Sequence, residues 1–165
     1  MIATRRQCLG SLMAGSVGAW LGVPLPRAAG ADPSAVEWQV LFLTNQQRVW
    51  RKLQPLSPSD ELASVARVHS RDMISRGFFD HRNPDGLGPG DRLARSGLRF
   101  PLWAENLCTI RGGPADGAAL ASAIVASWMD SRGHRHNILE PGFRVLGVGV
   151  AISGRTVMAT ELFGG

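Results

Sequence analysis

Two alternating segments joined by a short turn stand at the C-terminal end of the sequence, and they restrict the fold more than any other feature. Apolar side chains alternate over residues 146–152 and again over residues 156–163, and Ser153-Gly154-Arg155 lies between them. Alternation with a period of two is typical of half-buried strands, and a short turn containing glycine joins neighbouring strands. The sequence therefore predicts a β-hairpin here.

A first helix is predicted from residue 34 to about residue 51. Ser34 and Glu37 have the spacing of a capping box, which would place the helix start at Ser34. Apolar side chains recur at helical spacing along this segment. Those expected on the inner side are Val36, Val40, Leu43 and Trp50.

Two further helices are predicted, from residue 60 to about 76 and from residue 114 to about 129. Ser59 is suited to cap the earlier of these and Gly77 to end it. His69 falls on the apolar face of that helix, which favours a hydrogen-bonded core histidine over a ligand. Because helices come first and strands last, without strand-helix alternation, the order favours an α+β fold with helices over a small antiparallel sheet.

Residues 1–31 have the composition of an export signal. Arg5-Arg6 precedes an apolar run over residues 9–23, and small residues follow. The run is shorter than the roughly 20 residues that span a bilayer, so a cleaved signal peptide is expected rather than a transmembrane anchor. The paired arginines indicate twin-arginine export, with the general secretory route as the alternative. The remaining domain, residues 32–165, is expected in the periplasm or outside the cell.

Charge argues against a nucleic-acid partner. The chain has 18 basic and 13 acidic residues, but three of the basic ones lie in the predicted signal, so the remaining domain would carry only +2. No basic stripe with interleaved aromatic residues is present. Cys108 would be the one cysteine left, and it is expected to be a small core residue because a domain of about 134 residues needs no disulfide. A monomer is expected.

Two histidines and one glutamate occur in segments without clear periodicity. His81 and Glu105 lie in the glycine-rich stretch over residues 77–113, and His134 lies in a glycine-punctuated segment predicted as a loop. Long stretches of this kind are often functional. Two imidazoles and one carboxylate suit a zinc site with an open position. The same three groups could instead hydrogen-bond one another in a polar cleft.

Several motifs occur together in the order of a known family. They are Asn45-Gln46-Gln47-Arg48, His69-Ser70-Arg71-Asp72-Met73, Gly77-Phe78-Phe79-Asp80-His81, Asp91-Arg92-Leu93, Ala104-Glu105-Asn106-Leu107, Trp128-Met129-Asp130-Ser131, Gly133-His134-Arg135, Asn137-Ile138-Leu139 and Gly147-Val148-Gly149-Val150-Ala151. The chain thus resembles bacterial CAP-domain proteins of the SCP-like extracellular group, within the superfamily of cysteine-rich secretory proteins, antigen 5 and pathogenesis-related 1 proteins. The resemblance covers residues 35–165 and implies a three-layer α-β-α sandwich.

The resemblance also implies a central cleft. Animal and plant members place two histidines and two glutamates there, and His81, Glu105 and His134 match three of these positions. Ser131 stands at the fourth, where those members have a glutamate, and this departure removes one carboxylate. The implied cleft is therefore His81, Glu105, His134 and Ser131. Its candidate ligands for a divalent metal such as zinc are His81, Glu105 and His134.

Three functions are compatible with these residues. The first is an exported binding module whose cleft recognises a lipid, sterol or peptide-like ligand, with or without a divalent metal; the resemblance favours it, because lipid and sterol binding recurs in the superfamily while a common catalytic activity does not. The second is a metal-assisted hydrolase in which His81 and His134 hold the metal and Glu105 acts as ligand or general base. The third is an envelope interaction protein with an inert cleft. A serine nucleophile at Ser131 is disfavoured because no Gly-x-Ser-x-Gly elbow surrounds it.

Overall fold

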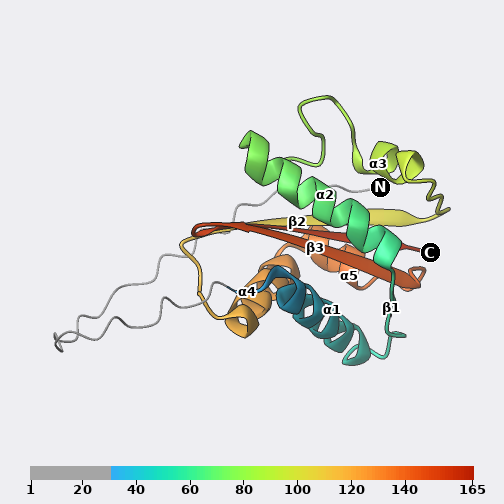
Figure 1. Ribbon diagram of the computed structural model, residues 1–165. Helices are drawn as coiled ribbons and strands as arrows, with labels where there is room; N and C mark the ends of the chain where they lie inside the picture. Colours follow the sequence, from blue (N-terminus) through green and yellow to red (C-terminus); the bar gives the residue numbers. More distant parts are fainter. Residues whose placement is uncertain (1–30) are drawn as a thin grey trace, which may run out of the picture.

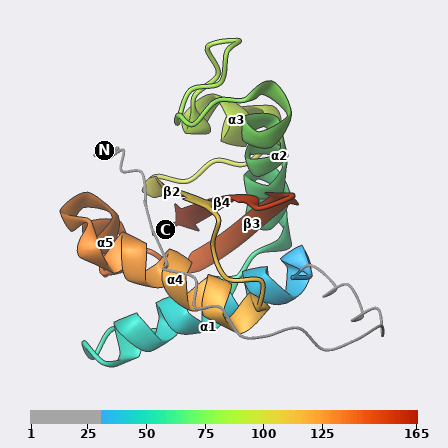
Figure 2. The same cartoon turned by 90° about the vertical axis from the view of Figure 1, so that its left-hand side faces the viewer.

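A four-stranded sheet separates two layers of helices in the computed structural model, which describes residues 31–165 (Figure 1). The elements in chain order are α1 (Pro33–Val49), β1 (Ser57–Pro58), α2 (Asp60–Arg76), α3 (Pro89–Arg95), β2 (Trp103–Arg111), α4 (Gly117–Asp130), α5 (Arg132–Ile138), β3 (Val145–Ser153) and β4 (Thr156–Gly164). α2 and α3 lie on one side of the sheet, and α1, α4 and α5 lie on the other (Figure 2). The predicted α+β class and three-layer α-β-α sandwich are confirmed.

The strands follow the order β1-β3-β4-β2. β3 and β4 form the predicted hairpin, with Ser153 opposite Thr156. β2 pairs antiparallel with β4, so that Asn106 lies directly opposite Glu161. Since successive side chains point to opposite faces of a strand, Asn106 and its neighbour Glu105 belong to different layers. β2 therefore places two neighbouring polar side chains on opposite faces of the sheet.

Two glycines of β3 allow α2 to lie unusually close to the sheet. A Cβ atom at Gly147 would come within 2.2 Å of the backbone nitrogen of Ala63, and one at Gly149 within 2.1 Å of that of Arg67. Ser70 donates a hydrogen bond to the carbonyl of Gly149 at 2.8 Å, which fixes the helix along its length. This contact holds α2, and with it the following loop, in a defined position.

The start of α1 differs from the prediction. Asp32 is the N-cap and accepts a hydrogen bond from the Ser34 nitrogen at 3.1 Å, so the capping box expected at Ser34 is wrong. Glu37 is buried instead and accepts from the Val150 nitrogen at 2.9 Å, because this edge of β3 has no neighbouring strand to satisfy it. Trp50, expected on the inner side, is 68% exposed.

The ends of the other long helices are closer to expectation. Ser59 caps α2, and Gly77 ends it in the left-handed region at φ 69°, as predicted. α4 begins at Gly117 rather than at residue 114, because Asp116 supplies the capping side chain and accepts from the Ala119 nitrogen.

Two segments that were predicted to lack regular structure contain a strand and a helix. Residues 77–113 include β2, whose alternation is hidden because polar side chains such as Asn106 are buried on it. The predicted loop around His134 is the short helix α5, in which the Arg135 nitrogen donates to the Ser131 carbonyl at 2.8 Å. A glycine costs a helix only about 1 kcal/mol, which tertiary hydrogen bonds can offset.

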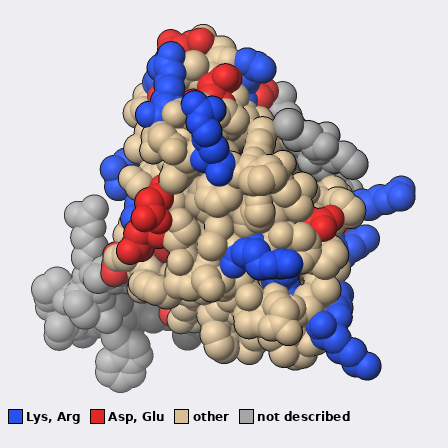
Figure 3. Space-filling model, turned by 90° about the vertical axis from the view of Figure 1, so that its right-hand side faces the viewer, with Lys and Arg blue, Asp and Glu red and all other residues tan. Residues whose placement is uncertain are grey.

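Residues 1–30, with most of the predicted signal peptide, lie outside the described part of the chain. Among the helices of residues 31–165, none combines the length and apolarity needed to cross a bilayer. Cys108 is 1% exposed and packs in the core, as predicted. On the face drawn in Figure 3, basic side chains are spread among acidic and uncharged ones.

Candidate functional site

His81 and Glu105 form the centre of the candidate site. His81 lies in the loop after α2, and its Nδ1 is 2.8 Å from Oε1 of Glu105 on β2. Because a carboxylate oxygen accepts, the proton of this bond lies on Nδ1. The Glu105 side chain is 1% exposed and that of His81 14%. Nε2 of His81 has no hydrogen-bond partner among the described residues.

Arg92 of α3 is the second partner of Glu105, and the sequence analysis did not single it out as a site residue. Its Nη2 lies 2.5 Å from Oε2 of Glu105. Its Nη1 donates to the carbonyls of His81 at 2.8 Å and Leu87 at 3.1 Å. Arg92 therefore fixes both the carboxylate and the loop that carries the imidazole. The one signal for it was its place in the Asp91-Arg92-Leu93 motif.

The electrostatics of this cluster favour a charged carboxylate. Burial by itself would raise the pKa of Glu105, but the hydrogen bond from His81 and the positive charge of Arg92 together lower it below its usual value. Glu105 therefore remains ionised and has both oxygens occupied. The guanidinium and the carboxylate offset each other's charge inside the protein.

His69 is a buried, hydrogen-bonded core histidine, as predicted, and it holds the loop that carries His81. It is 1% exposed, and its Nε2 donates to the Asp80 carbonyl at 3.0 Å, directly before His81. Its ring contacts that of Phe78, with centroids 5.8 Å apart. Burial lowers the pKa of His69, so the ring is neutral at neutral pH and Nδ1 is a hydrogen-bond acceptor. Nδ1 has no partner among residues 31–165.

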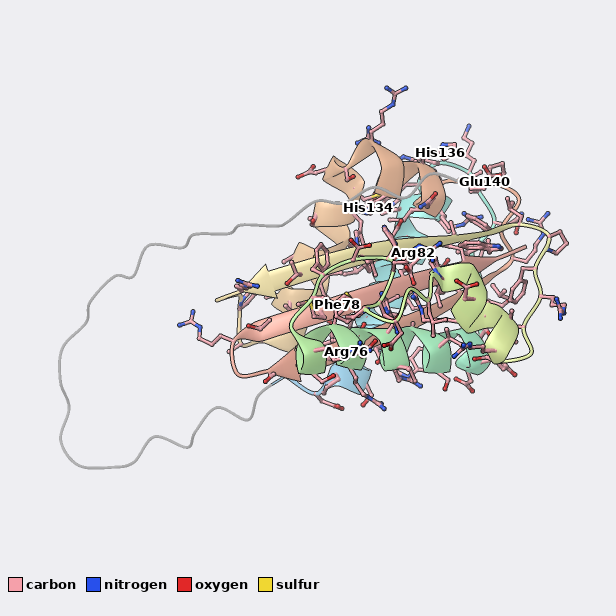
Figure 4. All side chains as sticks on the ribbon, turned by 90° about the horizontal axis from the view of Figure 1, so that it is seen from above. Arg76, Phe78, Arg82, His134, His136 and Glu140 are labelled. Atoms are coloured by element: carbon pink, nitrogen blue, oxygen red, sulfur yellow. The ribbon has the colours of Figure 1, made fainter. Side chains whose placement is uncertain are left out.

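His134 and Ser131 come from the opposite layer. Both are buried, His134 on α5 and Ser131 between α4 and α5. The His134 carbonyl accepts from Nδ2 of Asn106 at 3.2 Å, so its backbone is bonded to the residue next to Glu105. Figure 4 looks down on the sheet, and there His134 lies beyond the edge strand β2 as seen from Phe78 and Arg76. The structure thus joins His81 directly to Glu105, and a single cleft that also includes the side chains of His134 and Ser131 stays a prediction.

Arg135 and His136 are the α5 residues that directly follow His134 in the sequence. His136 is exposed at the surface (Figure 4). Arg135 anchors the segment by donating from Nη1 to the Met129 carbonyl at 2.6 Å. Neither side chain is bonded to His81, Glu105 or Arg92.

A second buried acid, Glu161 of β4, lies behind β2 and was missed by the sequence analysis. Its carboxylate accepts from Oγ1 of Thr44 at 2.7 Å and from Nδ2 of Asn106 at 3.1 Å. Asn137 of α5 donates to Oδ1 of Asn106 at 2.9 Å. Burial raises the pKa of Glu161 to about 7, against the lowering effect of these hydrogen bonds and of Arg48. The available signal was an acid at a core-facing position of the alternating strand.

A cavity of about 230 Å³ opens between α2 and α3 beside the cluster. Arg92, which bonds Glu105, and the buried His69 are among the residues that line it. Its apolar lining residues are Val65, Val68 and Leu87. The other lining residues are polar or charged, namely Ser64, Asp72, Asn83, Arg95 and Ser96, so the cavity combines an apolar part with a polar part.

The cluster does not fit a metal ion in this arrangement. Within residues 31–165, no group of three or more His, Cys, Asp or Glu side chains is placed to hold one. The guanidinium of Arg92 also occupies the position beside Glu105 that a cation would need. A metal would have to displace a buried, hydrogen-bonded cation, so we derive no chemistry through one.

Comparison with known proteins places the chain in a family. Residues 41–162 match the model described as "Cysteine-rich secretory protein family". The Bacillus subtilis protein YkwD is 36% identical over 127 residues, which are 77% of this chain and 47% of that protein. The Bacillus subtilis membrane protein YlbC is 35% identical over 115 residues, 69% of this chain and 31% of that protein. The chain thus spans less than half the length of these relatives.

Solved structures show the same fold. An extracellular protein with an SCP domain from Bacillus anthracis superimposes with a TM-score of 0.67 at 32% identity, over 80% of this chain and 41% of that one. An outer surface protein of Borrelia burgdorferi reaches 0.71 at 18% identity, over 82% of this chain and 96% of that one. At that identity the second likeness concerns the fold alone.

Proposed function

Because the chain belongs to the cysteine-rich secretory protein family, also called the CAP family, we propose that it is an exported binding module for an amphipathic ligand. The cavity between α2 and α3 would receive the ligand, and the cluster of His81, Glu105 and Arg92 would hold the cavity in shape. Of the lipid, sterol and peptide-like ligands suggested by the sequence, a hydroxyl-bearing lipid or sterol suits this cavity best. The observation that carries the proposal is the pairing of apolar walls with His69 and Arg92.

The polar side of the cavity suits a hydroxyl group. Nδ1 of His69 is an acceptor and Nε of Arg92 is a donor, and neither has a hydrogen-bond partner among the described residues. Buried polar groups normally have partners. A hydroxyl both donates and accepts, so it matches both kinds of group. A free carboxylate or phosphate is less suited, because Glu105 offsets the charge of Arg92 and the cavity lining also contains Asp72 beside Arg95.

The apolar side of the cavity would hold the hydrocarbon part of the ligand. Val68 lines the cavity and is 57% exposed, so a ligand in the cavity could cover part of its side chain. Covering such surface stabilises a complex by about 25 cal/mol for each Å² removed from water. We therefore expect Val68 at the rim to contribute to affinity, and His69 and Arg92 to determine the orientation of the ligand.

One observation favours a second candidate, a hydrolase. A carboxylate that holds Nδ1–H of a histidine leaves Nε2 as the basic nitrogen, as in the orienting half of a catalytic triad. Glu105 and His81 have this geometry, with 2.8 Å between the bonded atoms. No nucleophile among the described residues hydrogen-bonds Nε2 of His81, so water would have to be activated. The binding module remains the better supported function.

Ligand binding can be tested with a charge placed at the rim of the cavity. We expect Val68→Glu to reduce the binding of monoolein at least ten-fold, because the carboxylate would lie against the hydrocarbon part of the ligand. Binding would be measured by isothermal titration with protein recovered from the exporting cell, and extracted lipids would be identified by mass spectrometry. Leu102→Glu is the matched control, since Leu102 is also exposed, at 40%, but lies before β2 and does not line the cavity. Equal binding by both variants, or none by the wild type, would refute the proposal.

Zinc provides an independent test of the metal alternative. We expect added zinc to leave the melting temperature of the protein unchanged at pH 7, because Arg92 occupies the position next to Glu105. The measurement is thermal melting with and without equimolar zinc. Stabilisation that His81→Ala and His134→Ala both remove, while His136→Ala keeps it, would establish a metal site and contradict the arrangement described above.

A further inference from the structure

The outer side of α1 exposes an uncharged, aromatic surface. Six large apolar side chains are well exposed within residues 31–165, and four of them lie on α1 or directly after it. These four are Trp38 at 62%, Phe42 at 61%, Val49 at 55% and Trp50 at 68%. We call them the α1 aromatic stripe.

The stripe lies opposite the buried side of the helix. Trp38, Phe42 and Val49 recur at helical spacing, whereas Val36 and Val40 on the other side are fully buried. A surface helix normally directs charged and polar side chains outward. α1 instead directs aromatic side chains outward. Packing within the domain does not explain their exposed position.

No charged side chain of α1 is left on the outer side. The helix has 17 residues, and its two charged ones, Glu37 and Arg48, are buried. Glu37 is bonded to Arg67 at 2.8 Å and to the Val150 nitrogen. Arg48 donates to the carbonyls of Gln54, Ile138 and Glu140. The exposed polar residues of α1 are thus uncharged.

Two exposed cations directly follow the stripe. Arg51 and Lys52 come after Trp50, and both are exposed. Aromatic side chains with an apolar body and a polar edge favour the boundary between lipid headgroups and hydrocarbon. Basic residues beside them are attracted to anionic headgroups. The aromatic side chains lie along the helix and the two cations follow its C-terminal end, an arrangement that suits a helix lying on a membrane.

We propose that the α1 aromatic stripe docks on the surface of an anionic lipid bilayer. Trp38, Phe42 and Trp50 would insert among the headgroups, and Arg51 and Lys52 would contact lipid phosphates. α1 lies on the outside of its layer (Figures 1 and 2), so a flat surface can reach the stripe. The cavity between α2 and α3 is on the other side of the sheet and would face away from the membrane.

Area favours a bilayer over a second copy of the chain. The four side chains expose roughly 500 Å² together, if a fully exposed aromatic side chain presents about 200 Å². A stable protein interface needs about 800 Å² from each partner. A few aromatic side chains and cations, in contrast, are enough for reversible attachment to a membrane surface. The proposal does not depend on the ligand of the cavity.

Vesicle flotation tests the proposal with the protein recovered from the exporting cell. We expect it to bind vesicles of phosphatidylglycerol and phosphatidylethanolamine and to bind phosphatidylcholine vesicles at least ten-fold more weakly. The double variant Trp38→Gln/Phe42→Gln should lose at least ten-fold in partitioning without a change in melting temperature, because both side chains are exposed. Leu102→Gln is the matched control and should bind as the wild type does, because Leu102 is also exposed, at 40%, but lies neither on α1 nor in the cavity lining.

Salt and oligomeric state distinguish the remaining outcomes. Arg51→Gln/Lys52→Gln should reduce binding to the anionic vesicles and weaken its dependence on salt. Equal partitioning of the wild type and the Trp38→Gln/Phe42→Gln variant would overturn the proposal. So would a dimer in analytical ultracentrifugation that the same variant dissociates, in the absence of vesicle binding, because the stripe would then be a protein interface.

Discussion

Replacing Arg92 with methionine is expected to lower the free energy of unfolding by about 3–5 kcal/mol at pH 7. The change leaves the Glu105 carboxylate, whose side chain is 1% exposed, without its cation. It also removes the donor to the carbonyls of His81 and Leu87. Urea unfolding with an unchanged m-value measures the loss. We also expect the loss to shrink toward acid pH, where Glu105 can take up a proton.

A double variant separates the ion pair from the general effect of a smaller side chain. Arg92→Met/Glu105→Leu removes both charges, so it should recover a large part of the stability lost in Arg92→Met. Two substitutions would then be less harmful than one. If the double variant were as unstable as the sum of both single variants, Arg92 and Glu105 would not be coupled and the cluster would not be the unit described above.

Replacing Glu161 with glutamine is expected to stabilise the protein by about 3 kcal/mol at pH 8, since the pKa of Glu161 is about 7 in the fold against 4.5 in the unfolded chain. Between these values the folded state binds the proton and the unfolded state does not. The stability from this proton is therefore fully present below pH 4.5 and is lost as the pH rises through 7. Glutamine imitates the protonated acid at every pH.

The measurement is the difference between the two unfolding curves at several pH values. His69 acts in the opposite direction, because burial lowers its pKa and its contribution is lost as the pH falls below 6.5. Subtracting the Glu161→Gln curve from that of the wild type removes this contribution, which both proteins share. The difference should be near zero at pH 4.5 and grow toward pH 8. Parallel curves would mean that Glu161 is not proton-linked to folding.

The elements that the sequence predicted are those whose local signals agree with their final packing. β3 alternates because Gly147 and Gly149 face α2, which lies too close for a side chain, while the residues on either side of them face the layer of α1 and α4. α2 is bounded by Ser59, whose side chain accepts from the Leu62 nitrogen, and by Gly77, whose backbone is left-handed, and both signals act locally. His69 was recognised as a core histidine because it lies on the apolar face of α2, and that face is buried against the sheet.

The missed features depend on partners that are distant in the sequence. β2 has no clear alternation because Glu105 and Asn106 are polar on opposite faces and each is satisfied by another element. α5 forms around His134 with support from hydrogen bonds to Asn106. Arg92 gains its role only when the loop after α2 brings His81 against β2. No local pattern encodes such pairings.

The resemblance identified two members of the cluster, while the structure changes how they are used. His81 and Glu105 are in contact as expected, but Arg92 replaces the ligand set that a metal would need. The change follows from charge, because a buried carboxylate that already has a guanidinium partner gains little from a second cation. In this arrangement the Glu105 carboxylate belongs to a buried ion pair with Arg92, and metal binding stays a prediction that the zinc experiment tests.

Histidine side-chain NMR with monoolein and with zinc distinguishes a ligand-binding cavity from a metal site, because it reports on each ring nitrogen separately. We predict that His69 carries its proton on Nε2 and His81 on Nδ1, in line with their bonds to the Asp80 carbonyl and to Glu105. Monoolein should shift the Nδ1 signal of His69, and equimolar zinc should leave His81 and His134 unchanged. The account would be contradicted if zinc shifted the rings of His81 and His134 while monoolein left His69 unaffected.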